Sequence, residues 1–354
     1  MPIQKLLIQD FLQLAEQHPV FDVRSPGEYN HAHIPGAYSL PLFTDEERAV
    51  VGTTYKQQSR QKAIKTGLDY FGPKMRKMVE EVEALCSKLQ TANQQTTNIL
   101  VHCWRGGMRS AGVAWLLDLY GFKVYTLVGG YKAYRKWVRE QFEKEYSFKI
   151  IGGYTGSGKT LVLQQLSQQH ATINLEALAN HKGSAFGAMG PQPTQEMFEN
   201  LLANAFNQQQ TINNKPQTIW LEDESQRIGN LQIPMPLWNT MRKSPVYFLD
   251  IPFEERLDYI TEEYSKVEKE KLVNAVIRIQ KRLGGLETKN AINYLLEDNH
   301  KESFRILLRY YDKWYLKGLY NRENPESLLN KIPCSGVDTL TNTQNLVRWQ
   351  SATA

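Results

Sequence analysis

Cys103 is the residue of this sequence whose type and setting best suit covalent chemistry. It lies in the run VHCWRGGMRS, between a short apolar segment and a segment with helical periodicity. Gly106 and Gly107 allow the loop to curl so that successive backbone N–H groups point inward and hold an anion. The dipole of the next helix and the charges of Arg105 and Arg109 favour the thiolate. We therefore predict a nucleophilic thiolate inside an anion cradle.

The cradle is expected to consist of the residues between Cys103 and Arg109. These are Trp104, Arg105, Gly106, Gly107 and Met108. The alternative is a cysteine that only fills a core, which is how Cys86 fits the helical run VEALCSKL. The two glycines and the flanking arginines argue against this alternative for Cys103.

A second motif, GYTGSGKT, fits the phosphate-binding pattern GxxxxGK[ST]. The matching residues are Gly153, Gly156, Ser157, Gly158, Lys159 and Thr160. An apolar segment, FKIIG, precedes the motif and a helical pattern follows it, as a P-loop requires. The loop backbone would wrap phosphate oxygens, Lys159 would add a positive charge, and Thr160 would bind Mg²⁺. The motif predicts a diphosphate site and does not distinguish a nucleotide from another diphosphate.

Acidic residues follow a predicted strand in the run TIWLEDE. Glu222, Asp223 and Glu224 end this run, and one of them is expected near the magnesium ion. We favour Glu222 or Asp223, and the sequence does not separate these two from Glu224. A group of solvated acids after a strand is the alternative.

Basic residues recur near the C-terminus in a pattern that suits a phosphate backbone. Lys301, Arg305, Arg309, Lys313 and Lys317 are spaced every four residues, as one face of a helix requires, and Arg278, Lys281 and Arg282 form a second group. Aromatic residues among them, such as Trp314 and Tyr315, could stack on exposed bases. A solvated helix whose aromatic residues pack in the core is the alternative.

The elements that position these residues alternate between strand and helix. Strands are predicted at 19–23, 37–42, 98–102 and 124–127, and helices at 75–90 and 110–119. A second alternation has strands at 148–152, 172–175, 218–221 and 246–250, a helix at 159–168, and helical periodicity from about 254 to 320. This order predicts two α/β domains with parallel sheets. We expect a first domain at 1–140, a linker at 141–148, a P-loop domain at 149–260 and a helical, basic region at 261–354.

Composition restricts the class of protein further. The chain has 354 residues, 42 Lys and Arg against 37 Asp and Glu, and three cysteines. The mild positive charge permits a polyanionic partner without requiring one. An odd number of cysteines and a polar N-terminus predict free thiols, a reducing cytoplasmic setting and no membrane association.

Two further segments have open roles. Val51–Lys56 lies in an insertion and is either a lid on the Cys103 site or a surface elaboration. The run HKGSAFG, with Gly183 and Gly187, is either a loop that approaches a ligand or an ordinary loop.

The first 140 or so residues resemble a rhodanese domain. The resemblance is carried by the segments DVRSP, EY and HIPGA near the N-terminus and by LVGGYKA after the cysteine loop. It implies that Cys103 carries a chalcogen atom. One departure is the spacing, because five residues separate Cys103 from Arg109 where sulfur-transferring members have four. The longer loop is similar to that of dual-specificity phosphatases and leaves two interpretations: a phosphatase, or a chalcogen carrier whose donor is a phosphate.

Over nearly its full length the chain resembles the bacterial tRNA 2-selenouridine synthases. HCWRGGMRSAG, DEERAVVGTTYK, GYTGSGKT, HKGSAFG, LEDESQRIG and KRLGG carry this resemblance. It implies that 2-thiouridine at the wobble position of the tRNAs for Lys, Glu and Gln becomes 2-selenouridine. The implied route is S-geranylation by geranyl diphosphate and then selenium delivery from selenophosphate, with Cys103 carrying selenium. The enzyme that makes selenophosphate is an implied partner.

Three other functions remain open at this stage. An ATP-dependent tRNA sulfurtransferase would use the P-loop for a nucleotide. A dual-specificity phosphatase fused to a kinase-like module would use Cys103 for hydrolysis. A non-enzymatic RNA-binding protein with a nucleotide switch would need no catalytic thiol.

Overall fold

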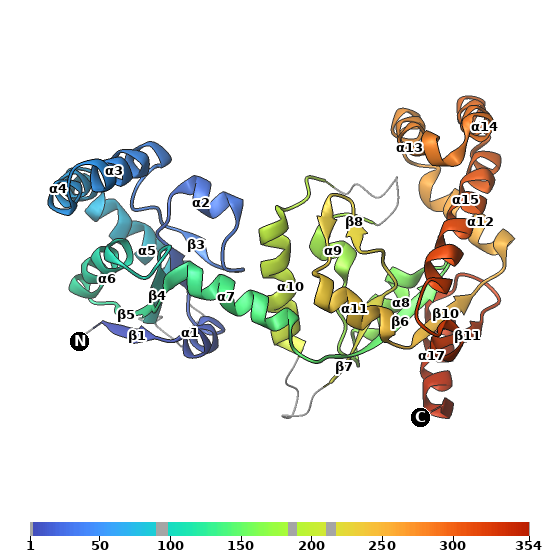
Figure 1. Ribbon diagram of the computed structural model, residues 1–354, viewed down its shortest axis with the longest axis horizontal. Coiled ribbons are helices and arrows are strands. Elements are labelled where there is room, and N and C mark those ends of the chain that lie inside the picture. The colour runs from blue at the N-terminus through green and yellow to red at the C-terminus, as the bar shows by residue number, and fades with distance from the viewer. Residues whose placement is uncertain (1–2, 90–97, 183–189, 210–216, 354) are drawn as a thin grey trace. The chain divides into compact units, whose positions relative to one another are not determined.

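The computed structural model describes residues 3–89, 98–182, 190–209 and 217–353 (Figure 1). Residue contacts divide the chain into two compact units, Met1–Gln141 and Phe142–Ala354. Each unit has its own parallel sheet and its own core, so we describe the two separately.

The first unit is built on a five-stranded parallel sheet in the order β1-β5-β4-β2-β3. Its strands are β1 (Gln4–Leu6), β2 (Val20–Asp22), β3 (Tyr38–Ser39), β4 (Asn98–His102) and β5 (Lys123–Leu127). Its helices are α1 (Ile8–Ala15), α2 (Pro26–His31), α3 (Asp45–Gln57), α4 (Arg60–Phe71), α5 (Met75–Leu89), α6 (Met108–Tyr120) and α7 (Gly130–Phe142).

Strand β4 is the central element and is buried on both faces, as strands of parallel sheets are. Ile99 and Val101 belong to the core formed with α5 and α6. His102 points to the other face, where its ring lies 6.4 Å from Phe11 of α1 and 6.3 Å from Tyr131 of α7. The alternation of strand side chains therefore places Cys103, the next residue, on the α6 side of the sheet.

The insertion between β3 and β4 folds into helices with clear local signals. Helix α3 begins with a capping box, in which the Thr44 hydroxyl accepts the N–H of Glu47 and the Glu47 carboxylate accepts the N–H of Thr44. Helix α4 begins at Ser59, whose hydroxyl accepts the N–H of Lys62. Helices α3 and α4 pack against each other.

The second unit has a four-stranded parallel sheet in the order β11-β10-β6-β7. Its strands are β6 (Ser147–Gly153), β7 (Thr218–Glu222), β10 (Val246–Asp250) and β11 (Leu329–Pro333), and a small hairpin joins β8 (Arg227–Ile228) to β9 (Leu231–Gln232). Its helices are α8 (Lys159–Leu166), α9 (Leu175–Ala179), α10 (Gln195–Gln209), α11 (Met235–Lys243), α12 (Phe253–Tyr264), α13 (Lys269–Leu283), α14 (Gly285–Leu296), α15 (His300–Tyr320), α16 (Pro325–Leu328) and α17 (Thr339–Thr353).

Helices α8 and α17 pack on one face of this sheet, where Ile151, Leu163 and Leu346 share a core. Helix α10 covers the other face, where Phe206 packs on Phe148 of β6. Helices α12 to α15 form a separate bundle with a core of its own. Within the described chain, no helix has the length and apolar character needed to cross a membrane.

The structure confirms two α/β units with parallel sheets and corrects three local predictions. Residues 172–175 form no strand, because only Thr172 makes a bridge, to Trp220, before α9 begins at Leu175. The region 261–354 is not wholly helical, since β11 pairs with β10 at the edge of the sheet. The predicted linker 141–148 includes the end of α7 and the beginning of β6.

Candidate active site: a thiol cradle and a phosphate-binding loop

Cys103 lies directly after β4, at the start of the loop that leads into α6, and is 3% exposed. Its Sγ atom lies 3.2 Å from the hydroxyl oxygen of Ser110, in the first turn of α6. Burial by itself raises the pKa of the thiol. Hydrogen bonds from the Ser110 hydroxyl and from backbone N–H groups at Ser110, Arg105 and Gly107 outweigh burial, so the pKa is lower than that of an ordinary cysteine. The loop therefore surrounds the thiol with hydrogen-bond donors, as an anion cradle requires.

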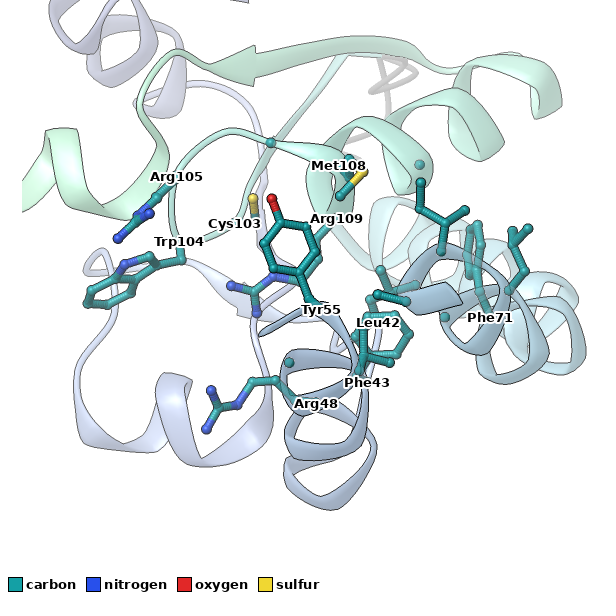
Figure 2. Close-up of a pocket in the computed structure, with 18 of the residues that line it drawn as sticks. Leu42, Phe43, Arg48, Tyr55, Phe71, Cys103, Trp104, Arg105, Met108 and Arg109 are labelled. Atoms are coloured by element: carbon teal, nitrogen blue, oxygen red, sulfur yellow. The ribbon is translucent and has the colours of Figure 1, made fainter. Parts of the chain in front are cut away.

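The two arginines of the loop contribute less than the sequence predicts. The Arg109 guanidinium donates to the Glu28 carboxylate at 2.9 Å, so much of its charge is neutralised in an ion pair. Arg105 points away from the Cys103 thiol, on the same side as Trp104 (Figure 2). The largest causes of the lowered pKa of Cys103 are hydrogen-bond donors, and the charges of Arg105 and Arg109 are not among them.

Backbone contacts from the start of α7 hold the loop in shape. The N–H of Tyr131 donates to the carbonyl of Cys103 at 2.8 Å, and the N–H of Lys132 donates to that of Trp104 at 3.0 Å. Gly130 has φ +57°, and a Cβ atom there would overlap the Cys103 carbonyl oxygen. The segment LVGGYKA, which carries part of the resemblance to a rhodanese domain, therefore supports the cysteine loop.

A cavity of about 1050 Å³ opens beside Cys103. Its walls come from α3, α4 and α6 and from the residues before α3 (Figure 2). The Arg109 side chain lies beside the thiol, and the apolar side chains of Leu42, Phe43 and Phe71 lie farther from it. The insertion with Val51–Lys56 is therefore a wall of the Cys103 site.

In the second unit, the predicted phosphate-binding motif joins β6 to α8. Gly156 and Gly158 have φ values of +81° and +70°, which a residue with a side chain rarely adopts. Lys159 lies across the loop and donates to the carbonyls of Gly153 at 2.9 Å and Tyr154 at 3.4 Å. The backbone thus has the form of a P-loop, with the N-terminus of α8 directed at the position a phosphate would take.

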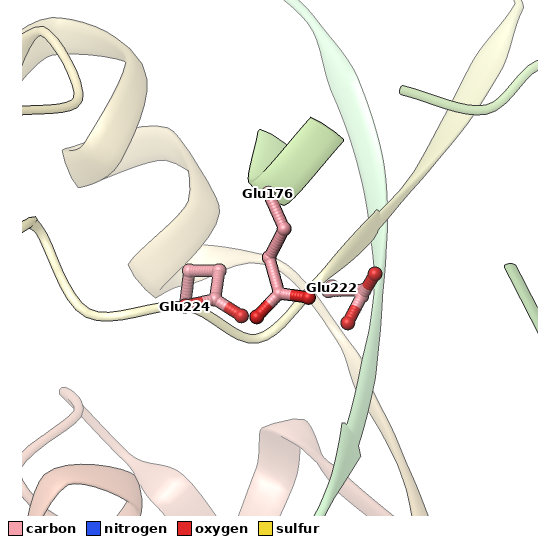
Figure 3. Close-up of side chains that lie close together, drawn as sticks. All are labelled: Glu176, Glu222 and Glu224. Atoms are coloured by element: carbon pink, nitrogen blue, oxygen red, sulfur yellow. The ribbon is translucent and has the colours of Figure 1, made fainter. Parts of the chain in front are cut away.

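Three glutamates gather near the P-loop motif (Figure 3). Oxygen atoms of Glu176, Glu222 and Glu224 lie within 4.8 Å of one another, and the Thr160 hydroxyl lies 3.1 Å from Glu222 and 3.3 Å from Glu176. Burial and the charge of Glu176 raise the pKa of Glu222 to about 7. Burial also raises the pKa of Glu176, and burial with Glu176 and Glu222 raises that of Glu224. Mutual repulsion of this kind is relieved by a cation.

Asp223 does not belong to this cluster. Its carboxylate accepts hydrogen bonds from the Tyr315 hydroxyl at 2.8 Å and from Arg322 at 2.6 Å. The alternation of side chains along the end of β7 explains this, because successive residues point to opposite faces. Among the three acids that the sequence left open, Glu222 and Glu224 gather with Glu176, and Asp223 points elsewhere.

The residues at the loop fit a diphosphate with a divalent cation. Mg²⁺ prefers oxygen ligands, and Thr160, Glu176 and Glu222 supply them. The Ser157 hydroxyl and one oxygen of Glu222 are buried and have no hydrogen-bond partner among the described residues. Such atoms are satisfied by phosphate oxygens or by a cation.

Helices α12 and α15 hold the back of the P-loop. The Tyr315 hydroxyl accepts the N–H of Gly153 at 3.1 Å. Arg256 of α12 donates to the carbonyl of Thr155 at 3.0 Å and forms an ion pair with Asp312 of α15. The Tyr315 hydroxyl therefore holds the P-loop, which is a role that the sequence analysis did not assign to it.

The predicted basic stripe divides into two parts. Lys301 pairs with Asp258, and Arg305 pairs with Glu254 and Glu302, so the charge of both is neutralised. Exposed basic side chains are found at Arg278, Lys281, Arg282, Arg309, Lys313 and Lys317. Arg282 of α13 and Lys317 of α15 lie 6.0 and 5.1 Å from the ring of Trp314, which is 43% exposed.

Three important residues escaped the sequence analysis. Glu176 directly follows residues 172–175, which we expected to form a strand. An acidic residue just after an expected strand is the same signal that pointed to Glu222. Ser110 is a hydroxyl residue in the first turn of the helix after the cysteine loop, a position from which it can reach the thiol. Glu28 gave no signal in the sequence for its pairing with Arg109. Gly183 and Gly187 lie outside the described residues.

The fold and the two loops define a rhodanese-like domain followed by a P-loop domain. A model of the rhodanese-like domain matches residues 7–136, and a model described as the tRNA 2-selenouridine synthase AAA domain matches residues 146–331. The chain belongs to the tRNA 2-selenouridine synthase family.

Two curated relatives agree with this assignment, and one solved structure is similar in sequence over a shorter stretch. The chain is 39% identical over 252 residues to a tRNA 2-selenouridine synthase of Nitrosomonas europaea, covering 70% of this chain and 63% of that one. It is 33% identical over 330 residues to one of Sulfurovum sp., covering 84% and 87%. A crystal structure of the N-terminal domain of a putative ATP/GTP binding protein from Clostridium difficile is 38% identical and covers 38% of this chain and 98% of that one, with a TM-score of 0.35.

Proposed function

We propose that this protein is a transferase that converts wobble 2-thiouridine of tRNA to 2-selenouridine in two steps. The observation that carries the proposal is the presence, in one chain, of a thiol with a lowered pKa and a P-loop with a carboxylate cluster. The names of the relatives support the overall conversion. The chemistry of each step follows from what the two sites offer.

The first step is S-geranylation at the P-loop. The sulfur of 2-thiouridine attacks C1 of geranyl diphosphate, the C–S bond forms, the C–O bond breaks, and N3 of the base releases its proton. The leaving diphosphate is held by the loop N–H groups and by Lys159. Mg²⁺, held by Thr160, Glu176 and Glu222, would supply further positive charge to the diphosphate.

The second step exchanges sulfur for selenium at the Cys103 cradle. The selenium of selenophosphate, held in the Cys103 cradle, bonds to C2 of the base, the C2–S bond breaks, and sulfur leaves as geranylthiol. Water then breaks the Se–P bond and releases phosphate, so no atom changes its oxidation state and no oxidant is needed. An alkylated sulfur leaves as a thiol, which the unmodified thiocarbonyl cannot do, and this explains why geranylation precedes selenium transfer.

The substrate tRNA requires a basic surface, and the exposed group around Trp314 supplies one. Arg282 and Lys317 would contact phosphates while Trp314 stacks on a base. By resemblance the substrates are the tRNAs for Lys, Glu and Gln, and the selenophosphate-producing enzyme is a partner. A tRNA substrate and a reactive free thiol both favour the reducing cytoplasm.

Two variants separate the steps. Lys159→Ala removes the positive charge at the diphosphate, so geranylation should fall by about two orders of magnitude. Cys103→Ser should still geranylate tRNA but form no selenouridine. Mass spectrometry of the nucleosides after incubation measures both products.

Lys243→Ala, which removes an exposed lysine at the end of α11, is the control and should behave as wild type. Intact geranylation in Lys159→Ala would remove the P-loop assignment. A requirement for ATP would instead favour an ATP-dependent sulfurtransferase.

A further inference from the structure

The cavity beside Cys103 is much larger than the anion cradle needs. Ligand pockets for small organic molecules measure about 300–1,000 Å³. The volume here is about 1050 Å³ and extends from the thiol along α3, α4 and α6. A phosphate-sized anion occupies only the cradle, so most of the cavity is available to a second chemical group.

The lining indicates that this group is apolar. Tyr55, Ile64, Leu68, Met108 and Trp115 all line the cavity and are 38 to 56% exposed. Large apolar side chains that gather in one place without covering one another mark a binding site. The buried side chains of Phe43 and Phe71 continue the apolar lining on the far side (Figure 2).

Glycines keep the cavity open. Gly52 in α3, Gly67 in α4 and Gly112 in α6 all line it, although glycine lowers the stability of a helix. A Cβ atom on Gly52 would meet no atom within 4 Å, and one on Gly112 would lie 3.7 Å from the ring of Phe71. Larger residues at these positions would occupy the space.

We infer that this cavity binds the geranyl chain of the S-geranylated 2-thiouridine nucleotide and thereby places its C2 atom at Cys103. The inference rests on the proposed function. The cavity has one polar end, at the thiol, and an apolar remainder, which is the order of groups in a base whose C2 carries a sulfur-linked hydrocarbon chain (Figure 2).

The occupant is the chain on the tRNA and not that of geranyl diphosphate. The diphosphate has its own cradle at the P-loop, with Lys159 and the carboxylate cluster, in the other unit. Next to Cys103, in contrast, Arg109 is already paired with Glu28, and Arg48 lies 3.7 Å from the same carboxylate.

Binding of the chain in this cavity makes the protein selective for the alkyl group on the sulfur of its substrate. A bound hydrocarbon chain gives affinity and orients C2, so the S-geranyl substrate should be preferred to an S-methyl one. Each additional methylene in an apolar pocket contributes roughly tenfold or more in selectivity. Geranylation at the P-loop then has two effects. It creates a leaving group, and it adds the hydrocarbon chain that binds in the cavity and places the base at the thiol.

The test uses the full-length protein, selenophosphate and two synthetic anticodon stem-loops, one with S-geranyl-2-thiouridine and one with S-methyl-2-thiouridine. Gly52→Leu fills the cavity, and Gly52→Ala is the matched control that leaves it open. We expect Gly52→Leu to raise the KM for the geranyl substrate by about tenfold or more and to leave that for the methyl substrate unchanged.

A second pair of variants shows whether an effect of Gly52→Leu comes from misfolding. Ile64→Asn makes the lining polar without filling it and should weaken the geranyl substrate alone, while Lys65→Asn, the next residue on α4, is exposed and should have no effect. Equal KM values for the geranyl substrate in Gly52→Leu and Gly52→Ala would overturn the inference. Failure of wild type to selenate either stem-loop would instead overturn the proposed function.

Discussion

Ser110 is the residue through which the reactivity of Cys103 can be changed without altering the thiol itself. Its hydroxyl and its backbone N–H both contribute to the lowered pKa of Cys103. The other two cysteines have no such partners. Burial raises the pKa of Cys86, and burial with the charge of Asp250 raises that of Cys334 to about 11. The three thiols therefore differ in the pH at which each becomes a nucleophile.

This difference predicts an order of alkylation. A lower pKa leaves more thiolate at a given pH, so iodoacetamide should modify Cys103 at lower pH than Cys86 or Cys334. Ser110→Ala removes one donor, so the profile of Cys103 should shift to higher pH and its rate near neutrality should fall about tenfold. Peptide mass spectrometry across a pH series measures this. Ser87→Ala, exposed on α5, serves as the control, and an unchanged profile in Ser110→Ala would contradict the account.

At the scale of elements, the cysteine loop depends on the first turn of α7. The N–H groups of Tyr131 and Lys132 hold the loop carbonyls, and Gly130 allows the two backbones to approach. A buried ion pair adds to this support, because Arg24 binds Asp22 and lies 3.7 Å from the ring of Tyr131. These residues of the rhodanese-like signature position the loop and do not touch the reacting atoms.

Gly130→Ala tests this support. A Cβ atom there would overlap the carbonyl oxygen of Cys103, so the loop must move and the N–H groups around the thiol lose their alignment. We expect the alkylation rate of Cys103 near neutrality to fall about tenfold or more, with a stability loss of roughly 1–3 kcal/mol. Gly72→Ala is the control, since a Cβ atom there meets nothing within 4 Å. Alkylation and urea unfolding like those of wild type in Gly130→Ala would show that α7 does not shape the cradle.

Local patterns predicted strands β2 to β7 and β10 and both chemical loops. The strand before Cys103, the P-loop between β6 and α8, and strands β7 and β10 all follow from apolar runs and glycine spacing. The miss at β11 arises from a contact distant in sequence. Strand β11 is short and half polar, and it is fixed by pairing with β10.

The same cause explains the misses within the site. Tyr315 and Arg322 determine which way Asp223 points, and both lie about a hundred residues away in the chain. Glu28 neutralises Arg109 across a comparable distance. Such pairings cannot be predicted from residue types and local periodicity.

For the whole molecule, the proposed function places tRNA on the exposed basic group around Trp314. Lys317→Ala should lower the salt dependence of tRNA binding by about one unit of slope, because one phosphate contact is lost. Trp314→Ala should weaken binding by about 1–3 kcal/mol through lost stacking. Filter binding across a salt series measures both effects.

Lys301→Ala is the matched control for Lys317→Ala, because Lys301 is already paired with Asp258. Its salt slope should equal that of wild type. A larger loss in Lys301→Ala than in Lys317→Ala would place the tRNA surface elsewhere.

The central claim is that one protein both alkylates the sulfur of tRNA and replaces it with selenium. Mass spectrometry of tRNA nucleosides tests it most directly, with purified wild-type protein and tRNA that contains 2-thiouridine. Geranyl diphosphate alone should give S-geranyl-2-thiouridine, and geranyl diphosphate with selenophosphate should give 2-selenouridine and geranylthiol. Absence of both modified nucleosides, with both compounds present, would contradict the account.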